Sequence, residues 1–128
     1  MRQVQRTFSG APWEAKVGYC RAIKVKDMIF VTGTTAVGPE GGIVGKGNPY
    51  EQACRCFEII KRSLQDLGAD TLHVVRTRMF VTDIAHWKEF GRAHFEYFGE
   101  HPPATTMVEV KALIDSDMLI EIEADAVV

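Results

Sequence analysis

Residues 102–125 read PPATTMVEVKALIDSDMLIEIEAD, and this stretch predicts much of the fold. The Pro-Pro pair at its start cannot continue a helix and favours extended backbone around it. Thr105 to Val110 is rich in Thr and Val, and Met118 to Val127 alternates apolar with mostly acidic residues, so both segments are expected to be strands. Ile114 to Asp117 (IDSD) predicts a turn between them, because Asp and Ser bond their own backbone there.

The last of these strands has two chemically different faces. Its apolar face consists of Ile120, Ile122, Ala124 and Ala126, and its acidic face of Glu121, Glu123 and Asp125. Such alternation is typical of a strand with one face in the core and one outside it. The carboxylate face must therefore meet water, a partner chain or a ligand.

Two amphipathic helices are expected before this stretch. The clearer one covers Asn48 to Leu67, with Asn48 as the N-cap and Gly68 as its end. Pro49 suits the first helical position. The apolar stripe of this helix is Ala53, Cys56, Phe57, Ile60, Leu64 and Leu67. Asp83 is expected to cap a second helix that reaches about Phe98.

The other segments supply further strands and loops. Tyr19 to Val25 and Met28 to Thr32 predict a hairpin. Val74 to Val81 predicts a strand with Val75, Thr77, Met79 and Val81 on one face, and Val4 to Phe8 a short one. Ser9 to Gly18 is expected to be a loop, and Val37 to Gly47 a loop or a hairpin flap. The sequence thus indicates an α+β domain with one sheet and two helices.

Composition and charge argue against several classes of function. The chain has 128 residues, a net charge of −2 and a pI near 6.1, which disfavours nucleic-acid binding by phosphate neutralisation. No apolar run approaches a membrane span, and Met1 to Gly10 has no signal-peptide core. Cys20, Cys54 and Cys56 are odd in number and lack CxxC spacing. Reduced thiols, a cytoplasmic location, and no metal or cofactor are therefore expected.

Five segments carry a resemblance to a known family. They are Gly18–Ala22 (GYCRA), Val31–Thr34 (VTGT), Arg76–Asp83 (RTRMFVTD), Pro103–Val110 (PATTMVEV) and Ile120–Ala124 (IEIEA). The chain resembles the Rid family of reactive intermediate deaminases, also called YjgF or endoribonuclease L-PSP. The resemblance implies a single Rid-like domain over residues 1–128 with a chorismate-mutase-like fold, that is, one mixed β-sheet with two helices packed on one face. It also implies a homotrimer that binds a small molecule in clefts between subunits.

The resemblance also implies an activity and a site. Active members hydrolyse enamines and imines, such as 2-aminoacrylate, to 2-oxo acids and ammonia. The Tyr that lines the cleft of such members falls on Tyr19, and their Ser-Gly segment falls on Thr32 and Gly33. The Glu that acts through the attacking water falls on Glu121.

Two positions depart from the family pattern. The Arg that binds the substrate carboxylate is replaced by Thr105, and an Asn common on the second helix falls on Gly91. A guanidinium grips a carboxylate with two charged hydrogen bonds, so a Thr in its place weakens such binding by ~10- to 100-fold. Either the ligand lacks the carboxylate, or another cation reaches the cleft; the candidates are Arg21, Arg76 and Arg78.

Plainer interpretations remain for each of these residues. Glu121 could be a solvated strand carboxylate, Tyr19 a packing residue, and Thr32 and Thr105 simple β-formers. Cys20 lies next to Tyr19, but a nucleophilic thiol needs a base that the sequence does not show nearby. A metabolite hydrolase and a non-catalytic trimer that binds a small metabolite or a protein both fit the sequence. A ribonuclease fits the sequence least, because the net charge is negative and no basic groove is evident.

Overall fold

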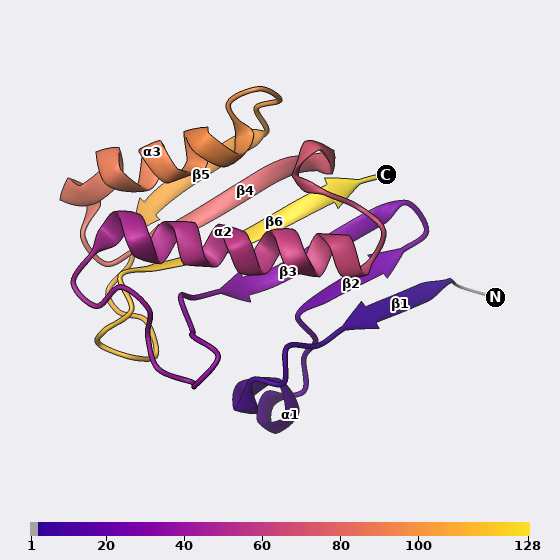
Figure 1. Ribbon diagram of the computed structural model, residues 1–128, viewed down its shortest axis with the longest axis horizontal. Helices are drawn as coiled ribbons and strands as arrows, with labels where there is room; N and C mark the ends of the chain where they lie inside the picture. Colours follow the sequence, from indigo (N-terminus) through magenta and orange to yellow (C-terminus); the bar gives the residue numbers. More distant parts are fainter. Residues whose placement is uncertain (1–2) are drawn as a thin grey trace.

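The computed structural model describes residues 3–128, whose strands form one six-stranded sheet in the order β1-β2-β3-β6-β4-β5 (Figure 1). The strands are β1 (Val4–Thr7), β2 (Ala22–Val25), β3 (Met28–Thr34), β4 (Val74–Val81), β5 (Ala104–Glu109) and β6 (Ile120–Val127). The paired strands are antiparallel except β4 and β5, which are parallel. The sheet is therefore mixed, and the predicted α+β class is confirmed.

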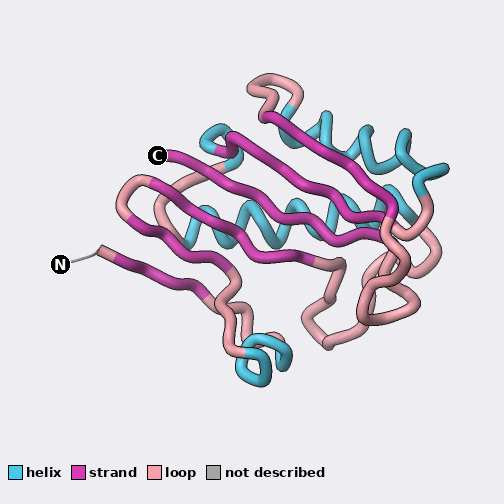
Figure 2. Tube along the Cα trace, turned by 180° about the vertical axis from the view of Figure 1, so that it is seen from behind, coloured by secondary structure: helices cyan, strands magenta, loops and turns pink. Residues whose placement is uncertain are grey.

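Two long helices cover one face of this sheet. They are α2 (Pro49–Asp66) and α3 (Trp87–Phe98), and Figure 2 shows the strands in front of them when the molecule is seen from behind. As predicted, Asn48 caps α2: its side chain accepts a hydrogen bond from the Glu51 backbone N–H at 3.0 Å. The other sheet face carries no helix of this length in the described part of the chain. This face is open to a ligand or a partner.

The core lies between the sheet and these two helices. The predicted inner face of β6 is confirmed, because Ile120, Ile122, Ala124 and Ala126 are all fully buried. They meet the apolar stripe of α2, in which Cys56, Phe57, Ile60 and Leu64 are also buried. Glu121, Glu123 and Asp125 consequently project from the open face.

The N-terminal part differs from the sequence-based expectation. The expected loop from Ser9 to Gly18 contains a short helix, α1 (Pro12–Val17), which starts at a proline and ends where Gly18 adopts a left-handed conformation (φ 92°). Strand β2 begins at Ala22, so Tyr19 belongs to the connection between α1 and β2. The expected strand from Tyr19 to Val25 is therefore shorter at its start.

Two later elements also differ. A register shift of β4 against β6 between Val74 and Arg76 buries Val74 and leaves Val75 48% exposed, so Val75 does not share a face with Thr77. Such a bulge adds one residue to the strand and cannot be read from alternation.

Asp83 caps a 3₁₀ turn (Ile84–His86), and α3 begins only after it. Segment 37–47 is a loop with one bridge, Val37 to Ile43. Within residues 3–128 no helix is long and apolar enough to cross a membrane.

Candidate functional site

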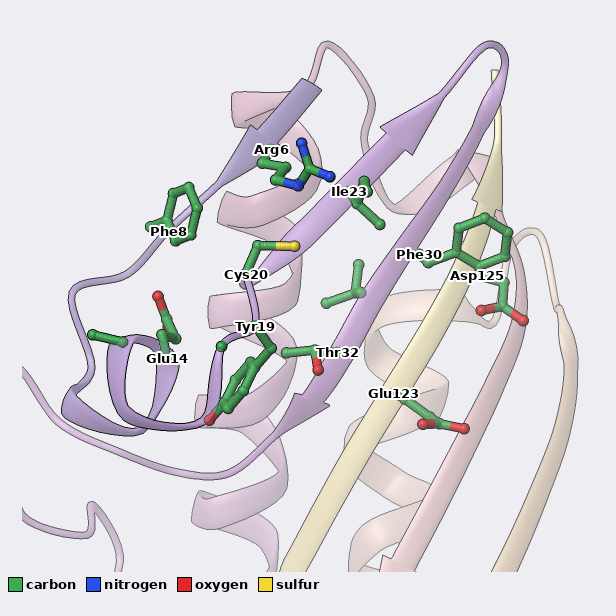
Figure 3. Close-up of a pocket in the computed structure, with 13 residues that line it drawn as sticks. Arg6, Phe8, Glu14, Tyr19, Cys20, Ile23, Phe30, Thr32, Glu123 and Asp125 are labelled. Carbon is green, nitrogen blue, oxygen red and sulfur yellow. The ribbon is translucent and has the colours of Figure 1, made fainter. Parts of the chain in front are cut away.

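A pocket of about 640 Å³ lies on the open face of the sheet, beside α1 (Figure 3). Two of the sequence-predicted site residues, Tyr19 and Thr32, line this pocket. Cys20 forms part of its wall, and Glu123 and Asp125 border it from β6. Gly33, Glu121 and Thr105 are not among its lining residues.

A buried ion pair holds α1 against the end of β3 and so shapes the pocket. The Glu14 carboxylate accepts hydrogen bonds from the backbone N–H of Ser9, at 3.0 Å, and from the Ser9 hydroxyl. It lies 3.6 Å from Nε of Arg21, and both side chains are almost fully buried. The guanidinium of Arg21 also stands 5.9 Å from the Tyr19 ring. The position of the Tyr19 ring therefore depends on this pair.

Glu121 lies directly over Gly33, where β3 and β6 lose their regular pairing. Their register shifts between Val31 and Thr34. A Cβ at Gly33 would overlap Oε2 of Glu121 and would lie 3.0 Å from its Cδ. Only a glycine at this position leaves room for the carboxyl group. Glu121 is half-buried, and within residues 3–128 no group donates a hydrogen bond to its carboxyl.

The electrostatic surroundings of Glu121 favour its protonated form. Burial raises the pKa of Glu121 above its ordinary value, the Arg21 charge partly offsets this, and Glu123 raises the pKa further. Arg21 donates to the carbonyl oxygen of Gly33 at 3.2 Å and to Oγ1 of Thr34 at 3.3 Å. A half-buried carboxyl group with a raised pKa is suited to proton transfer.

Two of the three candidate replacement cations, Arg21 and Arg78, are paired with other groups. Arg21 is only 8% exposed and is held by Glu14, Gly33 and Thr34. Arg78, on the open face, lies 3.2 Å from Oδ2 of Asp125 and 3.4 Å from Oε1 of Glu123. Arg76 is half-buried and stands opposite Asp125 in the strand register.

One cation at the pocket was missed by the sequence analysis. Arg6, on β1, lines the pocket together with Tyr19. The register places Arg6 opposite Ile23, Ile23 opposite Phe30, and Phe30 opposite Asp125, so these four side chains form one row across the open face. The sequence would have indicated Arg6 if the expected short strand from Val4 to Phe8 had been paired with the hairpin that begins at Tyr19.

Thr105 lies on the other side of the sheet. It stands opposite Thr77 in the parallel pair, and its Oγ1 is 2.7 Å from that of Thr77. Thr77 is buried under α3, where its Oγ1 is also 2.7 Å from Nε2 of His94. Gly91, one turn before His94, has open space where a Cβ would be. A single chain therefore does not bring Thr105 together with Glu121 and Tyr19, and the contacts to Thr77 and His94 were not foreseen.

The cysteines differ in accessibility. Cys56 is fully buried, and burial raises the pKa of its thiol, which keeps it unreactive. Cys20 and Cys54 are half-buried. Among residues 3–128 there is no group of His, Cys, Asp and Glu side chains arranged to hold a metal ion.

Comparisons with known proteins agree with this geometry. The family model of endoribonuclease L-PSP matches residues 9–128. An uncharacterized protein of Streptomyces coelicolor is 36% identical over 124 residues, covering 96% of this chain and 91% of that protein. A RutC family protein of Pyrococcus abyssi is 41% identical over 108 residues, which is 84% of each chain.

A solved structure gives the same picture. The crystal structure of Rv2704 from Mycobacterium tuberculosis, a member of the YjgF/YER057c/UK114 family, superposes with a TM-score of 0.90 at 40% identity, covering 98% of this chain and 100% of that one. The chain therefore belongs to the endoribonuclease L-PSP family, also known as YjgF or Rid. The chorismate-mutase-like fold expected from the resemblance is confirmed by these structural neighbours.

Proposed function

We propose that this protein is a Rid-like homotrimer that hydrolyses a small imine or enamine, or a related metabolite, in a cleft between subunits. Glu121 is the catalytic residue, and Tyr19, Thr32, Gly33 and Thr105 contact the substrate. The observation that carries the proposal is the Glu121 carboxyl group, half-buried over Gly33 with a raised pKa and no hydrogen-bond donor in the described chain.

The positions of the proposed residues favour a cleft shared by two chains. Glu121 projects from the open face of β6, whereas Thr105 lies on the helix-covered face of β5. Strand β4 separates them, and two strand spacings amount to about 10 Å. One small ligand can touch both residues only if they come from different copies. The open face also exposes Met28 and Phe30, which a second copy could cover.

The chemistry assigned to Glu121 is proton transfer during hydration of a C=N bond. The oxygen of a water molecule bonds to the imine carbon, and Glu121 carries a proton from that water to the nitrogen. In the resulting carbinolamine the hydroxyl proton passes to the nitrogen by the same route. The C–N bond then breaks, a C=O bond forms and ammonia leaves. A carboxyl group with a raised pKa both takes and returns such protons near neutral pH.

Ammonia release from freshly generated 2-iminobutyrate tests this function. Because Thr105 cannot grip the substrate carboxylate, the wild-type protein should be slow, and Thr105→Arg should be ~10- to 100-fold faster at low substrate concentration. Thr106→Arg, on the neighbouring and oppositely facing position, is the control and should stay at the wild-type rate. Glu121→Gln should remove the activity from both the wild-type protein and Thr105→Arg.

A second candidate is a non-catalytic trimer that binds a small metabolite or a protein. The replacement of the carboxylate-binding Arg by Thr105 favours it, because an enzyme acting on amino-acid-derived imines loses affinity with that change. If the wild-type protein and Thr105→Arg both release ammonia no faster than buffer alone, the hydrolase is refuted and the non-catalytic trimer is supported. A cytoplasmic location without nucleic-acid, membrane or cofactor partners belongs to both candidates.

A further inference from the structure

Three side chains under and beside α3 form a continuous hydrogen-bonded chain that ends at the surface. His94 Nε2 lies 2.7 Å from Thr77 Oγ1, and Thr77 Oγ1 lies 2.7 Å from Thr105 Oγ1. Thr77 is fully buried, His94 is half-buried between the rings of Phe57 and Phe98, and Thr105 is exposed. Distances this short are those of hydrogen bonds, and the direction of each bond depends on where its hydrogen lies.

The Thr77 hydroxyl has one proton, so this row of groups can be ordered in two directions. In one of them the Thr77 hydroxyl donates its single proton to Thr105. Nε2 of His94 must then carry a hydrogen and donate it to Thr77. Oγ1 of Thr105 is occupied as an acceptor from within, so its own proton is directed outward. The reverse order would need Nε2 without a hydrogen, and Thr105 would then offer only lone pairs to a ligand.

The surroundings of His94 keep it neutral. Burial lowers the pKa of His94, and no ionised group in the described chain shifts that pKa further. The ring is packed against aromatic neighbours, so its direction is fixed. A neutral imidazole offers the Thr77 hydroxyl either one N–H donor or one lone pair at Nε2, and no charge.

We infer that His94, acting through Thr77, is a positioning residue that makes Thr105 a hydrogen-bond donor to an uncharged acceptor, such as a ketone or carboxamide oxygen of the ligand. The inference rests on the proposed function in assigning Thr105 to the ligand site, and it names the ligand class there. A carboxylate is disfavoured at this point, because a neutral hydroxyl does not compensate its charge.

The proton order is tested by NMR without any ligand or turnover. In ¹⁵N-labelled protein at neutral pH, long-range proton–nitrogen spectra report which imidazole nitrogen carries the hydrogen, and His94→Gln identifies the His94 signals. We expect a neutral ring with the hydrogen on Nε2. A ring with the hydrogen on Nδ1 would overturn the inference, since Thr105 would then be an acceptor.

The ligand class is tested by comparing two probes, 2-oxobutanamide and 2-oxobutyrate, in binding titrations. Wild-type protein should prefer the amide, and Thr105→Val should weaken amide binding by ~2- to 10-fold, the effect of one neutral hydrogen bond. Thr106→Val, an isosteric change at the neighbouring position of β5, should leave it unchanged.

Variants of His94 separate positioning from packing. His94→Gln keeps an N–H donor and should retain amide binding, whereas His94→Leu keeps the apolar packing but lets the Thr105 proton turn inward, and should bind as weakly as Thr105→Val. Equal binding by His94→Gln and His94→Leu, or a wild-type preference for 2-oxobutyrate, would refute the inference. Binding of neither probe would refute the ligand class alone. The ammonia-release assay tests only the hydrolase activity. The proposed function and the inference about Thr105 can therefore be refuted independently.

Discussion

Replacing Gly33 by Ala tests whether the position of the Glu121 carboxyl group matters. The added Cβ would overlap Oε2 of Glu121 and lie 3.0 Å from Cδ, whereas ordinary Cβ contacts begin near 3.4 Å. The carboxyl oxygen must therefore move by more than about 1 Å, which is the scale of displacement that costs ~10²-fold in a positioned reaction. We expect the displaced group to move toward solvent, because the end of a Glu side chain gives way more easily than backbone.

The fold should survive this substitution. The backbone of Gly33 does not have a positive φ, so an L-residue is accommodated without strain. Gly→Ala at a compatible position stabilises by about 0.4–1 kcal/mol through the unfolded state, and this offsets part of the cost of moving Glu121. The melting temperature should stay close to that of Gly42→Ala, a control at which a Cβ meets open space.

Two measurements check the displacement. Carbon-13 NMR titration of the Glu121 carboxyl should show its pKa falling toward the ordinary Glu value in Gly33→Ala, because the group leaves its half-buried site. Ammonia release should fall ~10²-fold, with no further loss when Glu121→Gln is added, because both changes act on one group. An unchanged pKa of Glu121 together with full activity would show that the reasoning about this close approach is wrong.

Three further predictions concern stability. Glu14→Gln leaves the buried charge of Arg21 without its ion partner and should cost about 3 kcal/mol in denaturant unfolding; a cost below about 1 kcal/mol would show that the pair is solvated. Because the pKa of Glu121 is raised in the folded state, stability from this group is lost as pH rises through that pKa. The melting temperature of Glu121→Gln should therefore exceed that of the wild type at neutral pH and equal it in acid. A difference in melting temperature that stays constant across pH would contradict this. Gly91→Ala, in an uncrowded stretch of α3, should stabilise by about 0.5–1 kcal/mol, and a lower melting temperature would mean that the site is packed.

The sequence predicted those parts of the fold that depend on local periodicity. The alternation of Ile120 with Glu121 identified both faces of β6, and the cap at Asn48 identified the start of α2. The bulge at Val74 could not be predicted, because an extra residue reverses the facing of a strand without changing its composition.

The site was predicted less completely because it depends on contacts between distant segments. Alternation shows that Thr105 and Thr106 face opposite ways, but not which of them lies on the side of α3. The contact with Thr77 and His94 depends on the parallel pairing of β5 with β4, which joins segments 28 residues apart. Sequence reasoning could propose Thr105 for the ligand site, but the structure was needed to find the groups that orient its hydroxyl.

The charges around the pocket bear on the ligand independently of Thr105. The pocket is bordered by one guanidinium, that of Arg6, and by the carboxyl groups of Glu14, Glu123 and Asp125. Arg21 is paired with Glu14, and Arg78 with the two carboxylates of β6, so three guanidiniums offset these three carboxyl groups. These groups therefore supply no excess positive charge for a ligand carboxylate. The balanced charges around the pocket and the neutral hydroxyl of Thr105 thus favour the same property in the ligand, an uncharged polar group in place of a carboxylate.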